Sequence, residues 1–193
     1  EMVEQGFTAV KFDPAGPYTV RGGHQPSLTD IERSVTICRR IRETVGNRAD
    51  ILFGTHGQFT TAGAIRLARR LEPYDPLWFE EPCPPDNLLE FANVAKQCRI
   101  PVATGERLTT KAEFATLLRT GGVVALHSGA AVERLKVEFD RHEIDRTQVD
   151  LAVIGPRVPE MAGEGWRSIH IAGAPGDSEL LALAQALCQT DEH

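Results

Sequence analysis

The stretch Leu77-Trp-Phe-Glu-Glu-Pro82 places a short apolar strand directly before two acidic residues and a proline. Similar stretches stand on either side of it: Ile51-Leu-Phe-Gly54 precedes Thr-His-Gly57, and Pro101-Val-Ala103 precedes Thr-Gly-Glu106. The positions just past the three strands, Gly54, Glu80 and Glu106, follow one another at intervals of 26 residues. Units of equal length deliver one residue each to the same edge of a sheet. The spacing therefore predicts a shared rim of polar side chains.

Helical segments separate these strands and carry residues that start or stop helices. The expected order is a strand at Thr8–Phe12, a loop from Pro14 to Pro26, a helix opened by Thr29 with Glu32 and ending at Gly46, a strand at Ile51–Phe53, a helix from Thr61 to Leu71, a strand at Leu77–Phe79, a helix opened by Asn87 with Glu90, a strand at Pro101–Ala103, and a helix capped by Thr110 with Glu113 that ends at Gly121. Alternating strands and helices of this kind predict an α/β fold with a parallel sheet. In such folds the functional site lies at the carboxyl ends of the strands.

Composition narrows the class of protein. The chain has 193 residues, 41% hydrophobic and 25% charged, with a formal net charge of −6. An acidic balance disfavours nucleic acid, so a small molecule is the expected partner. No apolar run has the length of a membrane span and no signal peptide is expected, which predicts a cytoplasmic protein. The four cysteines show no paired spacing, so reduced thiols are expected near the core.

The stretch from about residue 6 to residue 121 resembles the enolase superfamily, in its mandelate racemase-like branch of acid-sugar dehydratases such as galactonate dehydratase. The likeness is carried by Val10-Lys-Phe-Asp13, Gly54-Thr-His-Gly57, Trp78-Phe-Glu-Glu-Pro82 and Ala103-Thr-Gly-Glu-Arg-Leu108, in the order of barrel strands two to five. A complete barrel needs roughly 250 residues, so a partial (β/α) TIM-type barrel of strands two to five or six is expected. The resemblance implies a magnesium-dependent hydro-lyase that abstracts a proton α to the carboxylate of an acid sugar.

The resemblance also implies roles for individual residues. Glu80 and Glu106 would hold Mg²⁺, which prefers oxygen ligands, and His56 would be the general base. Lys11 would be a second catalytic residue, in contact with the substrate carboxylate, and Asp13 and Arg107 would be substrate-binding residues. Simpler readings stay open: a glutamate before a helix often caps it, and a lysine at a strand end is commonly solvated.

Two departures from the family pattern affect this expectation. Gly54 stands where the first metal ligand is usually an Asp, and Asp13 stands where the strand usually has a second lysine. The later strands that supply the opposing acid are not recognised. Three outcomes stay open: His56 or Asp13 completes a modified site, the chain holds its ion weakly, or the site is no longer catalytic. We expect weak magnesium binding and no measurable acid-sugar dehydration.

After Gly121-Gly122 the expected barrel pattern ends. Residues 123–193 weakly resemble the second part of uroporphyrinogen-III synthase, in Leu126-His-Ser128, Ala152-Val-Ile-Gly-Pro156, Ala162-Gly-Glu-Gly-Trp166 and Asp177-Ser-Glu-Leu-Leu181. The resemblance implies tetrapyrrole binding without a cofactor, in which Ser128 would supply a hydroxyl. A serine just after a strand is equally a helix cap.

Two segments are therefore expected, 1–121 as a partial enolase-superfamily barrel and 122–193 as an α/β tail. They would join in one continuous, imperfect parallel sheet. Two functions compete with the dehydratase: a tetrapyrrole-cyclising or tetrapyrrole-binding segment, and a non-catalytic fusion fragment. Because a partial barrel leaves sheet edges open, we expect the tail helices to cover one edge or the chain to form a homo-oligomer.

Overall fold

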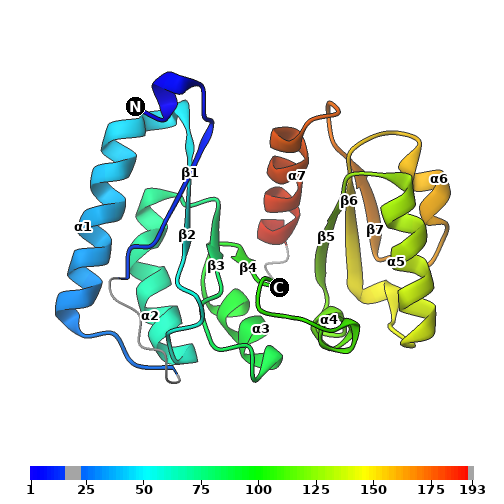
Figure 1. Cartoon of the computed structure of the whole chain (residues 1–193), viewed down its shortest axis with the longest axis horizontal. Coiled ribbons are helices and arrows are strands. Elements are labelled where there is room, and N and C mark those ends of the chain that lie inside the picture. Colours follow the sequence, from blue (N-terminus) through cyan, green and yellow to red (C-terminus); the bar gives the residue numbers. More distant parts are fainter. Residues whose placement is uncertain (16–22, 191–193) are drawn as a thin grey trace. The chain divides into compact units, whose positions relative to one another are not determined.

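The computed structural model describes residues 1–15 and 23–190, so part of the loop expected from Pro14 to Pro26 lies outside the described residues. The chain divides into two compact units, Glu1–Arg107 and Leu108–His193 (Figure 1). The predicted boundary at Gly121-Gly122 thus lies inside the second unit. The prediction that segments of two different families are joined at Gly121-Gly122 stays a prediction.

The first unit alternates strands and helices as the sequence predicts. Its elements are β1 (Ala9–Phe12), α1 (Leu28–Val45), β2 (Asp50–Gly54), α2 (Thr61–Leu71), β3 (Trp78–Glu80), α3 (Leu88–Gln97) and β4 (Val102–Ala103). The strands form one sheet in the order β1-β2-β3-β4, and each neighbouring pair is parallel. The βα order therefore gives the sheet that a partial barrel requires.

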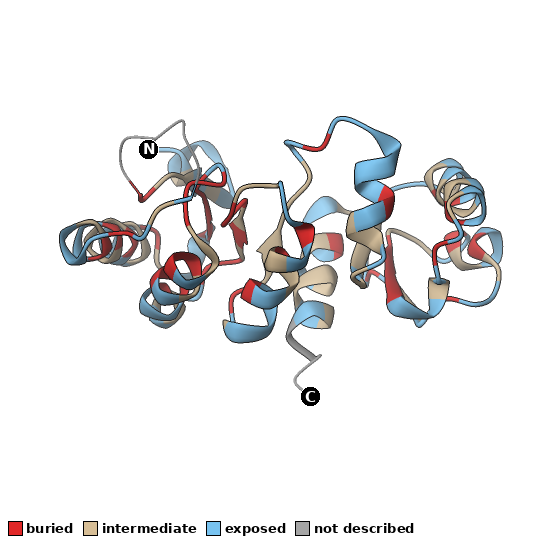
Figure 2. Ribbon diagram, turned by 90° about the horizontal axis from the view of Figure 1, so that it is seen from below, coloured by how far each residue is buried: buried red, intermediate tan, exposed pale blue. Residues whose placement is uncertain are grey.

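The register of this sheet separates a core face from a site face. Phe12, Phe53, Phe79 and Val102 form a row across the four strands and belong to the core that α1, α2 and α3 cover. The rings of Phe53 and Phe79 lie 4.5 Å apart between centroids. Since successive side chains of a strand point to opposite faces, the side chains of Lys11 and Glu80 are directed away from these helices, and Gly54 lies on the same face. Figure 2 shows the buried residues gathered between the helices and strands of this unit.

One predicted helix start is wrong. The sequence pattern placed a capping box at Thr29 and Glu32, but α1 begins at Leu28 because Ser27 is the N-cap and its hydroxyl accepts from the Asp30 amide at 3.1 Å. The other three predicted starts are confirmed: α2 begins at Thr61, Asn87 caps α3, and Thr110 caps the next helix, where Glu113 completes a reciprocal capping box.

The second unit contains α4 (Lys111–Leu118), β5 (Gly122–Leu126), α5 (Gly129–Arg141), β6 (Val149–Val153), α6 (Val158–Ala162), β7 (Ser168–Ile171) and α7 (Asp177–Thr190). The three strands form a parallel sheet in the order β5-β6-β7. Leu151 packs with residues of α5 and α6, whereas the adjacent Ala152 packs with Leu180 of α7. Helices on both faces are typical of a doubly wound sheet, whereas a barrel carries its helices outside only.

The expectation of one continuous sheet is also wrong, because the described strands form two sheets. Each unit closes its own core: the clusters around Phe53 and around Phe139 share no residue. Each of the two sheets thus has its own hydrophobic core.

The cysteines are mostly core residues. Cys38 and Cys83 are buried, Cys98 is half-buried and Cys188 is exposed, which is an exception to the expectation. Burial raises the pKa of the Cys38 thiol to about 12 and that of Cys83 to about 11. Burial of this kind is typical of cysteines that serve as packing groups. Within the described parts of the chain, no helix has both the length and the apolar character needed to span a membrane.

Candidate functional site

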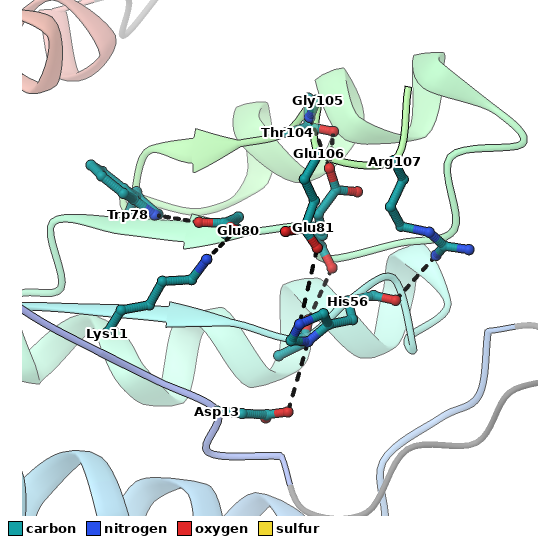
Figure 3. Close-up of polar contacts among 11 residues, drawn as sticks. Lys11, Asp13, His56, Trp78, Glu80, Glu81, Thr104, Gly105, Glu106 and Arg107 are labelled. Atoms are coloured by element: carbon teal, nitrogen blue, oxygen red, sulfur yellow. Dashed lines mark hydrogen bonds and ion pairs between the residues drawn. The ribbon is translucent and has the colours of Figure 1, made fainter. Parts of the chain in front are cut away.

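The predicted site residues lie at the carboxyl ends of adjacent parallel strands. β2 ends at Gly54, two residues before His56, β3 ends at Glu80, and β4 ends at Ala103, three residues before Glu106. Parallel pairing of β2, β3 and β4 brings these ends to one edge. The prediction that these residues lie at one edge is confirmed (Figure 3). Their equivalence is confirmed only for Gly54 and Glu80, because Ala103 is the residue opposite Glu80 on β4 and Glu106 lies three residues further, in the following turn.

His56 lies between two carboxylates (Figure 3). Its Nδ1 is 4.0 Å from Oδ2 of Asp13, and its Nε2 is 4.0 Å from Oε1 of Glu106. Arg107 reaches the same turn, where a guanidinium N–H donates to the His56 carbonyl oxygen at 3.1 Å. His56 adopts a φ of 50°, in the left-handed region that few non-glycine residues occupy. The structure therefore brings together four of the predicted residues: Asp13, His56, Glu106 and Arg107.

Glu80 has a different set of partners. The ammonium group of Lys11 donates to Oε1 of Glu80, and the indole N–H of Trp78 donates to Oε2 at 3.1 Å. The side chain of Glu80 is 16% exposed, whereas that of Lys11 is 47% exposed. The contact with Lys11 is thus reachable from solvent. Both oxygens of this predicted metal ligand are already engaged.

The backbone at Gly54 leaves room for a side chain beside this pair. Gly54 is opposite Glu80 in the ladder between β2 and β3. A Cβ atom at position 54 would lie 3.4 Å from Cε of Lys11 and 3.5 Å from Cβ of Glu80, both ordinary contact distances. The usual family residue at this position, Asp, would therefore direct its carboxylate to the site face.

The groups present do not fit a magnesium ion. Magnesium requires near-octahedral oxygen coordination and gives up its water reluctantly. Among residues 1–15 and 23–190, no group of three or more His, Cys, Asp or Glu side chains is placed to hold a metal ion. Glu80 is paired with Lys11, and Gly54 provides no oxygen. The role of Glu80 and Glu106 as metal ligands accordingly stays a prediction.

The adjacent glutamate, Glu81, is a site residue that sequence reasoning missed. It is 1% exposed, and its Oε1 accepts from the Thr104 hydroxyl at 2.9 Å and from the Gly105 amide at 2.8 Å. The signal available in the sequence was the pair of adjacent acids before Pro82. Strict alternation along a strand would direct Glu81 to the core face, where a carboxylate is not expected.

In the second unit, Ser128 is a helix cap. Its hydroxyl accepts from the Ala131 amide at 3.2 Å, and α5 begins at the next residue, Gly129. This contact accounts for the serine without a ligand. The tetrapyrrole-binding role of Ser128 stays a prediction.

Known proteins resemble this chain over most of its length. The sequence model of the family described as "Enolase C-terminal domain-like" matches residues 1–132. A D-xylonate dehydratase of Haloferax volcanii is 37% identical over 123 residues, which cover 62% of this chain and 30% of that protein. A D-galactonate dehydratase of Ralstonia nicotianae is 34% identical over 160 residues, or 78% of this chain and 42% of that protein.

Solved structures give the same result. A mandelate racemase/muconate lactonizing enzyme-like protein from Roseovarius sp. TM1035 matches with a TM-score of 0.62 and 49% identity, over 90% of this chain and 46% of that one. A mandelate racemase/muconate lactonizing enzyme from Sulfitobacter sp. matches with a TM-score of 0.62 and 38% identity, over 99% and 57%. The chain thus spans less than half the length of these curated relatives and about half that of the solved chains.

The family match runs past the predicted boundary, to residue 132. Nothing in these matches supports the resemblance of residues 123–193 to uroporphyrinogen-III synthase or the prediction of a fusion. Both stay predictions from the sequence.

Proposed function

The chain belongs to the enolase C-terminal domain-like family, and from this premise we propose that residues 1–107 supply the carboxylate-binding and proton-abstracting part of an acid-sugar dehydratase site. Relatives named as dehydratases of D-xylonate, D-gluconate and D-galactonate support acid sugars as the substrate class. The observation that carries the proposal is the position of His56, after β2, between Asp13, after β1, and Glu106, after β4, at the carboxyl edge of one parallel sheet.

In this proposal His56 is the general base. Asp13 faces Nδ1 and orients the ring, which leaves Nε2 on the Glu106 side of the rim to accept the proton α to the carboxylate. Lys11 and Arg107 are the cations of the rim. The ammonium of Lys11 is half exposed beside Glu80 and can exchange that partner for a substrate carboxylate.

Membership of this family implies a divalent metal ion, which would supply charge stabilisation next to the developing enediolate. Since the donors present do not fit magnesium, the chain's own residues are expected to bind the acid sugar without completing the dehydration. The proposed function of the 193 residues is therefore that of a dehydratase-like domain with an incomplete site.

Ligand-observed NMR with D-galactonate, D-gluconate and D-xylonate tests this proposal. The corresponding neutral aldoses are the controls that are not expected to bind. Lys11→Met is expected to weaken acid-sugar binding at least about fivefold, because it removes one charge-assisted contact to the carboxylate. The matched control is Lys96→Met, which removes the same charge from an exposed position on α3. Equal binding of acid sugars and aldoses, or equal loss in both variants, would contradict the proposal.

A further inference from the structure

Glu81 is the buried ionisable group that the proposed mechanism does not use. It stands among the largest fully buried side chains of the described residues, and the others in that set are apolar. A carboxylate in such a place is costly unless its hydrogen bonds repay the loss of water. Its φ of 48° adds backbone strain, since a non-glycine residue rarely adopts the left-handed region. A buried acid on a strained backbone calls for a physical reason.

The side chain of Glu81 holds the loop that follows β4. Oε1 accepts two hydrogen bonds, one from the hydroxyl of Thr104 and one from the backbone amide of Gly105. These two donors immediately precede Glu106 in the chain. The carboxylate therefore fixes the backbone from which Glu106 projects (Figure 3).

The backbone of Glu81 holds the turn that follows β2. Its carbonyl oxygen accepts from the Thr55 hydroxyl at 3.0 Å and from the Gly57 amide at 2.6 Å. Those donors lie on either side of His56. The amide of Glu81 in turn donates to the Ala103 carbonyl at 2.9 Å, at the end of β4. One residue thus contacts the strand-end segments that carry both His56 and Glu106.

The second carboxylate oxygen has no role in this bracing. Oε2 of Glu81 has no hydrogen-bond partner among the described residues. An apolar side chain of the same length would fill the space at a lower desolvation cost, so packing does not explain the carboxylate. The carboxylate differs from such an apolar side chain by the two hydrogen bonds that Oε1 accepts.

We propose that Glu81 is a positioning residue that sets the spacing between His56 and Glu106. Its carbonyl anchors the turn of His56, and its carboxylate anchors the turn of Glu106, so the separation of 4.0 Å between Nε2 of His56 and Oε1 of Glu106 depends on this one residue. The assignment rests on the proposed function only for the roles of His56 and Glu106. The bracing itself is a property of the protein without substrate.

NMR on the full chain, with neither metal nor sugar added, tests the bracing. Glu81→Met keeps the length and apolar bulk of the side chain but removes the acceptor. The exchange protection of the Gly105 amide is expected to fall at least about tenfold, while that of the Gly57 amide, bonded to the carbonyl of residue 81, changes less than about threefold. Glu81→Gln retains an acceptor at Oε1 and is expected to restore most of the protection at Gly105.

A second readout separates positioning from loss of stability. In the unmodified chain, Glu106→Gln is expected to shift the ring resonances of His56, because the two groups are 4.0 Å apart. In the Glu81→Met background that response is expected to fall at least about twofold, and in the Glu81→Gln background to persist. Glu72→Ala is the matched control, since Glu72 also accepts from a backbone amide, that of Arg99 at 2.9 Å.

Unchanged protection of Gly105, or an unchanged response of His56, in Glu81→Met would overturn the proposal. If that variant does not fold, the same measurements on Thr104→Val decide it, because this change removes one of the two donors to Oε1. No reduction of the His56 response in Thr104→Val would then count against the positioning role. A chain that binds no acid sugar leaves these results intact, so the two proposals can fail separately.

Discussion

Gly54 pairs with Glu80 across the parallel ladder of β2 and β3, and a Cβ atom at position 54 would lie 3.5 Å from Cβ of Glu80. The family resemblance puts a carboxylate at position 54, where this chain has only a hydrogen atom. On the other side of the same space, Lys11 donates to Glu80. Glu80 is therefore paired with the ammonium group of Lys11, and the carboxylate expected at position 54 is missing.

The strand that presents Glu80 and Glu81 depends on the aromatic core behind it. Phe79 is fully buried against Phe53, so Phe79→Ala is expected to lower the free energy of unfolding by about 3–5 kcal/mol. Phe7→Ala is the matched control: Phe7 is 53% exposed, and its loss is expected to cost less than about 0.5 kcal/mol. Denaturant unfolding followed at Trp78 checks both. Equal effects of the two changes would show that the core described for β3 is wrong.

Ser128 offers a choice between a structural and a ligand-binding role. Ser128 is the N-cap of α5, so Ser128→Ala is expected to lower the free energy of unfolding by about 0.5–2 kcal/mol. Ser128→Asp is expected to recover most of that loss. Unfolding of the second unit, followed at the buried Trp166, measures this. Full stability of Ser128→Ala, together with a loss of bilane binding, would instead favour the tetrapyrrole-binding prediction.

Asp150 makes the stability of the second unit depend on pH. Burial acts to raise the pKa of this carboxyl, but hydrogen bonds from Arg167 and Ser168 outweigh it and hold the pKa below its ordinary value. The folded form therefore gains stability above the unfolded pKa of about 3.9, and loses it as the pH falls through the folded pKa. The free energy of unfolding of the second unit, measured between about pH 6 and pH 2, is expected to fall toward low pH; this fall is called the acid limb below.

Asp150→Asn is expected to flatten that limb and to lower stability at neutral pH, since the pair with Arg167 is lost. Asp177→Asn removes the same charge from an exposed position and controls for net charge. An acid limb of the same steepness in Asp150→Asn and in the unmodified chain would contradict the assignment.

Several elements of both units follow from local sequence. Strands such as Trp78–Glu80 are short apolar runs that end in turn residues, and the capping box of Thr110 and Glu113 is confirmed. The start of α1 was misjudged because Ser27 with Asp30 and Thr29 with Glu32 both fit the capping pattern. The local pattern alone does not choose between two caps that are two residues apart.

The parts that sequence could not predict depend on contacts between distant segments. The sequence did not indicate a role for Glu81, because that role depends on a left-handed φ and on hydrogen-bond donors from two other loops. The local alternation of apolar and polar residues shows neither. Likewise, the presence of Glu80 at a strand end could be predicted, but its pairing with Lys11, 69 positions away, could not. The split into two sheets depends on which distant strands pair with one another, and the alternation of elements does not reveal this.

The central claim is that the rim is an enolase-superfamily site made incomplete at Gly54. Titration calorimetry with Mg²⁺ on the unmodified chain, Gly54→Asp and Gly54→Asn tests it most directly. We predict weak binding by the unmodified chain, binding at least about tenfold tighter by Gly54→Asp, and little gain in the neutral Gly54→Asn, with no acid-sugar dehydration by any of the three. Equal affinity of the unmodified chain and Gly54→Asp would mean that position 54 does not face the metal. Robust dehydration by the unmodified chain would contradict the claim as a whole.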